Sequence, residues 1–102
     1  MAGSITLADG KAQAVRPDIT QTVTVAGASA ATTNPVSIRT EIIRIVSTTD
    51  CYVEIGSAPV ATAADWYLPA YLVEYFRVEP GSDKVAVLQV SAGGTLFVTE
   101  CN

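Results

Sequence analysis

The sequence predicts an all-β protein, an antiparallel β-sandwich of jelly-roll-like form with an extended N-terminal arm. Short segments in which apolar and polar residues alternate recur roughly every ten residues, and turn sequences separate them. β-branched residues dominate these segments, and no longer segment has the helical period. A chain of 102 residues favours one domain. We place that domain at residues 18–102, after an arm at residues 1–17.

The arm and the strands follow in order along the chain. In the arm, Ile5 and Leu7 alternate with polar residues before an irregular stretch, and Arg16-Pro17 favours extended backbone. Loops of small residues, a Pro-Gly turn and a tight Gly-Gly hairpin connect the later segments. The expected strands cover residues 19–26, 36–47, 51–56, 73–78, 84–91 and 95–100.

The first two expected strands differ in regularity. The first places Ile19, Val23 and Val25 on one face and threonines on the other, as in a half-buried strand. The second begins by alternating and then changes phase at Ile42-Ile43. One extra residue at that point predicts a β-bulge, which would bend the strand around a core.

The last two expected strands carry apolar residues on both faces. Ala86 and Leu88 share one face, Val85 and Val87 share the other, and Phe97 points away from its apolar neighbours. A sandwich strand with one face in water normally has apolar residues on the other face only. We therefore expect the N-terminal arm or another subunit to cover the outer face.

The composition indicates a protein that associates with other proteins. The charged share is 16%, against a usual value of about 25%, which suggests that part of the surface faces another subunit. The net charge is −4 and the six basic residues are dispersed, so nucleic-acid binding is not expected. No apolar run approaches the roughly 18 residues of a membrane helix. The first residues lack a signal-peptide pattern, so we expect a soluble protein made in the cytoplasm.

The residue types offer no catalytic constellation and no cofactor site. The sequence has no histidine, which excludes Ser-His-Asp and Cys-His arrangements and removes the commonest metal ligand. Acidic residues flank both Cys51 and Cys101 and disfavour a reactive thiolate. We expect two reduced strand cysteines, with a disulfide in an extracellular particle as the open alternative. The sequence therefore predicts neither an enzyme nor a metal or cofactor protein.

The stretch "DWYLPAYLVEYFRV" at residues 65–78 contains most of the aromatic side chains. Strand alternation assigns Phe76 to the core. The remaining aromatic residues have three possible roles, which are core packing, a subunit interface and a platform for sugar rings. They are Trp66, Tyr67, Tyr71 and Tyr75.

Residues 43–100 resemble small structural proteins of tailed bacteriophages, a loose set that includes capsid cement and decoration proteins. The resemblance rests on a strand with an Arg and a Cys, then "IG-x-x-P-x-A", "Y-L-P", "E-Y-F-x-V-x-P-G", "K-V-A-V" and "S-A-G-G-T-L-x-V-T-E". It implies a small β-sandwich or jelly roll that sits over contacts between major capsid proteins, often as a dimer or trimer. Residues 1–17 lie outside it.

The resemblance and the composition lead to one preferred function and two alternatives. The preferred function is a capsid cement or decoration protein on the virion surface, bound to the major capsid protein or other virion proteins. The alternatives are another virion component of the tail, neck or head fibre, and a carbohydrate-binding module for host recognition. The candidate partner-binding residues are Ile5, Leu7, Trp66, Tyr67, Tyr71, Tyr75, Val85, Val87 and Phe97.

Overall fold

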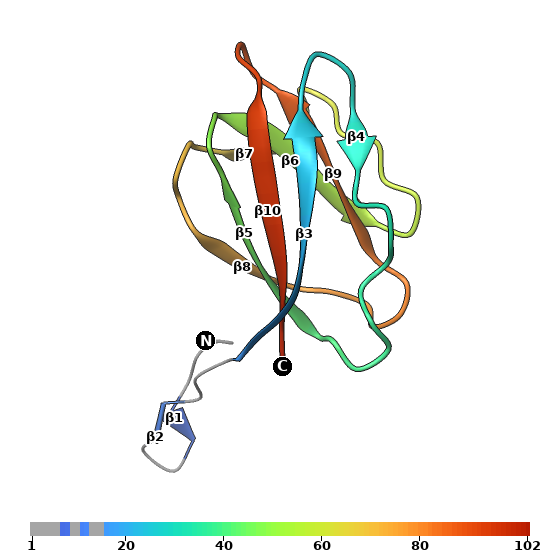
Figure 1. Cartoon of the computed structure of the whole chain (residues 1–102), viewed down its shortest axis with the longest axis vertical. Coiled ribbons are helices and arrows are strands. Elements are labelled where there is room, and N and C mark those ends of the chain that lie inside the picture. The colour runs from blue at the N-terminus through green and yellow to red at the C-terminus, as the bar shows by residue number, and fades with distance from the viewer. Residues whose placement is uncertain (1–6, 9–10, 13–15) are drawn as a thin grey trace.

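The computed structural model describes residues 7–8, 11–12 and 16–102. Within these residues the protein is all-β, and two four-stranded antiparallel sheets face each other, as Figure 1 shows. The prediction of an all-β chain with antiparallel sheets is therefore confirmed. No helix capable of crossing a membrane occurs in the described part of the chain.

From β3 onward, successive strands alternate between the two sheets, except that β6 and β7 both belong to the second sheet. The first sheet has the order β3-β10-β5-β8 and the second has the order β4-β9-β6-β7. The first consists of β3 (Pro17–Val25), β10 (Gly94–Cys101), β5 (Ile42–Ser47) and β8 (Glu74–Arg77). The second consists of β4 (Ala30–Ala31), β9 (Lys84–Gln89), β6 (Cys51–Gly56) and β7 (Trp66–Leu68). A separate small hairpin pairs β1 (Leu7–Ala8) with β2 (Lys11–Ala12).

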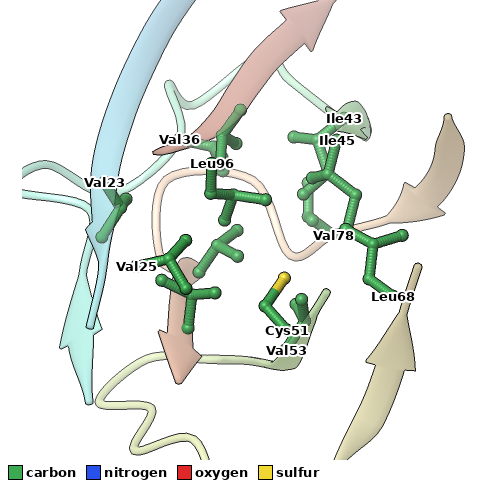
Figure 2. Close-up of a cluster of buried hydrophobic side chains, with 13 residues drawn as sticks. Val23, Val25, Val36, Ile43, Ile45, Cys51, Val53, Leu68, Val78 and Leu96 are labelled. Atoms are coloured by element: carbon green, nitrogen blue, oxygen red, sulfur yellow. The ribbon is translucent and has the colours of Figure 1, made fainter. Parts of the chain in front are cut away.

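The core lies between the sheets and is built from alternate residues of the strands. Since successive side chains of a strand point to opposite faces, every second residue reaches this layer. The cluster includes Val23 and Leu96 from the first sheet and Cys51 from the second, and Figure 2 shows the Cys51 sulfur among the apolar side chains. Apolar burial of this kind stabilises the fold by roughly 25 cal/mol for each Å² removed from water.

One expected strand begins later than the sequence pattern predicts. Residues 36–41 form turns and irregular backbone, and β5 starts at Ile42. The change of phase at Ile42-Ile43 therefore marks the entry into the strand, and the prediction of a bulge there is wrong. A register shift occurs instead between Thr99 and Cys101 of β10, where that strand pairs with β3.

Two short strands lie where the sequence predicts connections. β4 is part of an expected small-residue loop, and β7 contains the first aromatic residues of the 65–78 stretch. Both are edge strands that pair with a longer neighbour, β9 for β4 and β6 for β7. Two or three residues are too few to show an alternating pattern, so pairing with the neighbour forms these strands.

The end of the sandwich near Arg16 and Asn102 is held by polar contacts. The backbone N–H of Arg16 donates to the carbonyl of Asn102, and the reverse bond is also present, each at 2.9 Å. The buried Glu100 carboxylate accepts hydrogen bonds from the Thr40 hydroxyl at 2.6 Å and from the Ser37 hydroxyl at 2.5 Å. Because a buried carboxylate needs donors to replace water, these bonds fix the 37–40 turn against β10.

Candidate interaction surface

The outer face of the first sheet brings together residues from three strands. Phe97 of β10 lies directly opposite Val46 of β5, and Tyr75 of β8 lies opposite Arg44 of β5. Phe97 and Tyr75 are exposed, although the neighbours of Phe97 along β10, Leu96 and Val98, are buried in the core. The outward orientation predicted for Phe97 and Tyr75 agrees with this exposure.

A hollow of about 360 Å³ opens on the same face. Across the strands, Thr20 of β3 pairs with Thr99 of β10, and Thr99 pairs in turn with Arg44. The hydroxyls of Thr20 and Thr99 are 3.0 Å apart and hydrogen-bonded to each other. The side chains that line the hollow are Pro17, Thr20, Arg44, Tyr75, Thr99 and Cys101.

The connection from β7 to β8 presents apolar side chains beside this face. Tyr71 is 73% exposed and has a φ of 62°, a left-handed conformation that costs a residue with a side chain about 1–2 kcal/mol. Two hydrogen bonds hold it there. The N–H of Tyr71 donates to the Ser47 carbonyl at 2.7 Å, and the N–H of Ala70 donates to the Asp50 carboxylate at 2.8 Å. The following residues, Leu72 and Val73, are exposed as well.

Trp66 lies at the edge where β7 and β8 face each other across the sandwich. Its ring packs edge-to-face against Phe76, with centroids 5.6 Å apart and an interplanar angle of 86°. Phe76 packs against the core cluster, in agreement with its predicted role. Trp66 is therefore partly a structural residue that closes the gap between two edge strands, although 53% of its surface stays exposed.

Tyr67 belongs to the outer face of the second sheet. It pairs across the strands with Tyr52, and the two rings are 6.0 Å apart in an edge-to-face arrangement. A hydrogen bond to the Asp50 carboxylate raises the pKa of Tyr67, because the phenol must keep its proton to donate, and burial and the negative charge of Asp50 act in the same direction. The structure thus places Trp66, Tyr67 and Tyr75 on different sides of the molecule, and they do not form one flat platform.

Two candidate interface residues lie in the core instead. Val85 and Val87 are 1% and 0% exposed and belong to the cluster between the sheets. Their expected availability to a partner is therefore wrong. Because Ala86 and Leu88 on the opposite face are also apolar, the sequence pattern of β9 does not distinguish its inner face from its outer face.

The two arm residues differ in how far they can be described. Ile5 lies outside the described residues. Leu7 is in β1, where its backbone pairs with Ala12 of β2. Their predicted part in an interface stays a prediction.

The cysteines and acidic side chains have no reactive arrangement in the described part of the chain. Cys51 and Cys101 are both free and buried. Burial raises the pKa of each thiol, so both are held in the neutral form. No group of three potential metal ligands occurs among residues 7–8, 11–12 and 16–102.

Comparisons with known proteins identify no relative. No family model, no curated protein and no solved structure matches the chain. The candidate surface is therefore argued from its own residues.

Sequence reasoning missed four residues of this surface, which are Arg44, Val46, Leu72 and Val73. Alternation with the buried Ile43 and Ile45 is the signal that would have placed the first two on an outer face.

Proposed function

We propose that this protein is a structural component of a tailed-phage virion, acting as a capsid cement or decoration protein. The observation that carries the proposal is the outer face of the first sheet, where the exposed Phe97 and Tyr75 flank Arg44 and Val46. Aromatic residues and arginine are the types enriched at protein interfaces. Exposed apolar groups that cluster in this way mark association sites more often than isolated ones do.

We infer further that the two sheets form a jelly roll. The support is the pairing pattern, in which β3 pairs with β10, β4 with β9, β5 with β8 and β6 with β7. The first of these eight strands pairs with the last, the second with the second-last, and so on inward to β6 and β7. A long hairpin that is rolled into two sheets has this pairing pattern. An eight-stranded roll of two four-stranded sheets is common among viral capsid domains.

The proposed mechanism is additive burial at subunit contacts. Each copy would cover the junction between neighbouring capsid proteins and raise the free energy needed to separate them. A standard interface buries about 1,600 Å² in total. Many such contacts on one particle act together, so modest affinity per copy is sufficient. A dimer or trimer of this chain would place several such faces on one junction.

The direct test adds the purified protein to capsids that lack it. Binding is measured by co-sedimentation, and stabilisation by the temperature at which the capsids release DNA. We expect binding at a fixed number of copies per particle and a higher release temperature. Phe97→Asp should abolish binding. Val60→Asp is the matched control, because Val60 is also exposed but lies outside the described face.

Three outcomes would redirect the proposal. Failure of the unaltered protein to bind capsids would exclude the cement role. A copy number near six or twelve in an electron-microscopy map would instead indicate a tail or neck component. Binding on a glycan array that Trp66→Ala removes, with folding intact, would indicate a carbohydrate-binding module.

A further inference from the structure

We infer that the hollow around Arg44 is a receptor site for the carboxylate of an acidic side chain on a protein partner. This inference deepens the proposed function, because it names the chemistry that the outer face of the first sheet would recognise. The hollow, of about 360 Å³, is at the lower end of the size range of ligand pockets and has room for an acidic side chain. Its walls combine one cation, two hydroxyls and the ring of Tyr75.

The charge distribution favours an anionic partner group. The chain carries a net charge of −4, yet from Thr20 onward the outward strand positions of the first sheet include no Asp or Glu. These positions are Thr20, Thr22, Thr24, Thr95, Phe97, Thr99, Cys101, Ile42, Arg44, Val46, Tyr75 and Arg77. Two acidic residues next to these positions, Asp18 and Glu41, are paired with Arg39 and Arg77. A positively charged face on an acidic protein complements an acidic patch on its partner.

Among the described residues, Arg44 is the cation at an outward position of the first sheet that forms no ion pair. Arg77 is paired with Glu41 at 3.3 Å. Within the described residues no carboxylate lies within the 4.0 Å of an ion pair to Arg44, and the pairs that occur there involve Arg39 and Arg77. Arg44 is half-buried as a residue, and partly buried charges are screened less by salt than fully exposed ones. Its planar fork matches a carboxylate in a two-point hydrogen bond.

The threonine pair provides one further donor. Thr20 and Thr99 have two hydroxyl protons between them, and their mutual hydrogen bond uses one. The second proton is available to a carboxylate oxygen in the hollow. The thiol of Cys101 does not compete as an anion, since it is directed to the Thr99 carbonyl at 3.6 Å. The ring of Tyr75 and the ring of Pro17 offer apolar contact to the methylene groups of a glutamate side chain.

A titration followed by NMR tests this site on the full chain. The probe is N-acetylglutamate N-methylamide, and the neutral control is the corresponding glutamine compound. Two or three charge-assisted hydrogen bonds support roughly millimolar affinity. We expect saturable shifts of the Thr20, Arg44, Tyr75 and Thr99 resonances with the glutamate probe. The glutamine probe should produce no saturable shift there.

Matched variants separate the hollow from general charge effects. Arg44→Gln should weaken glutamate binding at least tenfold, and Arg44→Lys should weaken it less, because the charge stays but the fork is lost. Arg77→Gln removes an equal charge from the same face and should change binding less than twofold. Shifts that spread over the surface, or that survive Arg44→Gln, would overturn the inference. Equal shifts with inorganic phosphate would overturn the carboxylate assignment in favour of a general anion site.

Capsid binding distinguishes failure of this inference from failure of the proposed function. If the unaltered protein binds capsids but Arg44→Gln binds as well as Arg77→Gln does, the receptor role of the hollow is wrong and the cement role stands. If the glutamate probe saturates the hollow but capsids are not bound, the carboxylate site stands and the cement role fails. We expect Arg44→Gln to weaken capsid binding at least tenfold. Capsids with this variant should also release DNA at a lower temperature than capsids with the unaltered protein.

Discussion

Replacement of Trp66 by alanine tests how much of the aromatic stretch belongs to the fold. Trp66 is 53% exposed, so slightly less than half of its surface is removed from water. For a tryptophan this is about 100 Å² of mostly apolar area, or roughly 2.5 kcal/mol. The edge-to-face contact with Phe76 adds about 1 kcal/mol. Alanine retains a small part of this contact area, and we therefore expect Trp66→Ala to lower the free energy of unfolding by about 3 kcal/mol.

The measurement is urea unfolding followed by circular dichroism, because Trp66 is the chain's one tryptophan and its fluorescence disappears with the substitution. Tyr71→Ala is the control. Its side chain is 73% exposed and alanine bears the same left-handed backbone cost, so the change should stay below about 0.5 kcal/mol. If Trp66→Ala costs less than about 1 kcal/mol, or no more than Tyr71→Ala, the edge between β7 and β8 is not closed by this contact.

Three further predictions concern the polar end of the sandwich, a turn and the thiols. Glu100→Gln should lower the free energy of unfolding by about 2 kcal/mol, measured by urea unfolding, because the hydrogen bonds from the Ser37 and Thr40 hydroxyls lose a charged acceptor. An unchanged urea midpoint would show that the charge adds nothing to stability. Gly81→Ala should lower the free energy of unfolding by about 1 kcal/mol, because Gly81 has a φ of 74°. Gly56→Ala is the control and should be tolerated, because a Cβ added at Gly56 meets no atom within 4 Å. Equal thermal midpoints of the two variants would contradict this prediction. Burial raises the pKa of Cys51 and Cys101 in the folded state, so the stability that they confer is complete below about pH 8.5 and is lost as the pH rises above it, when the unfolded thiols ionise. The urea midpoint should therefore be lower at pH 9.5 than at pH 7, and the variant with both Cys51→Ala and Cys101→Ala should show a smaller difference between the two pH values. An equal or larger difference in that variant would refute the role of the thiols.

Local patterns were sufficient for the type of fold but not for all strand limits. The alternation of Val23 and Val25 with threonines, and of Leu96 and Val98 with Phe97, matches their burial in the structure. β-branched residues at every second position have few stable alternatives to a half-buried strand. The sequence pattern places the start of β5 too early, because a turn that contains apolar residues such as Val36 and Ile38 imitates the start of a strand.

The candidate surface was only partly visible in the sequence. Phe97 and Tyr75 were found because each is an aromatic residue at an outward position of a regular strand. The sequence does not single out Arg44, since an arginine in a strand gives no indication of its neighbours in adjacent strands. Its importance depends on Thr20 and Thr99, which come from two other strands and reach Arg44 only through the order β3-β10-β5.

The amino-acid sequence by itself determined that this chain forms antiparallel β-structure and that it lacks the histidine chemistry of common catalytic sites. Both follow from residue types and their spacing along the chain. The tertiary structure decided that Val85 and Val87 face the core, that Trp66 closes an edge against Phe76, and that a hollow forms around Arg44. These results depend on contacts between distant segments. When a strand is apolar on both faces, only the sheet packed against it decides which face is removed from water.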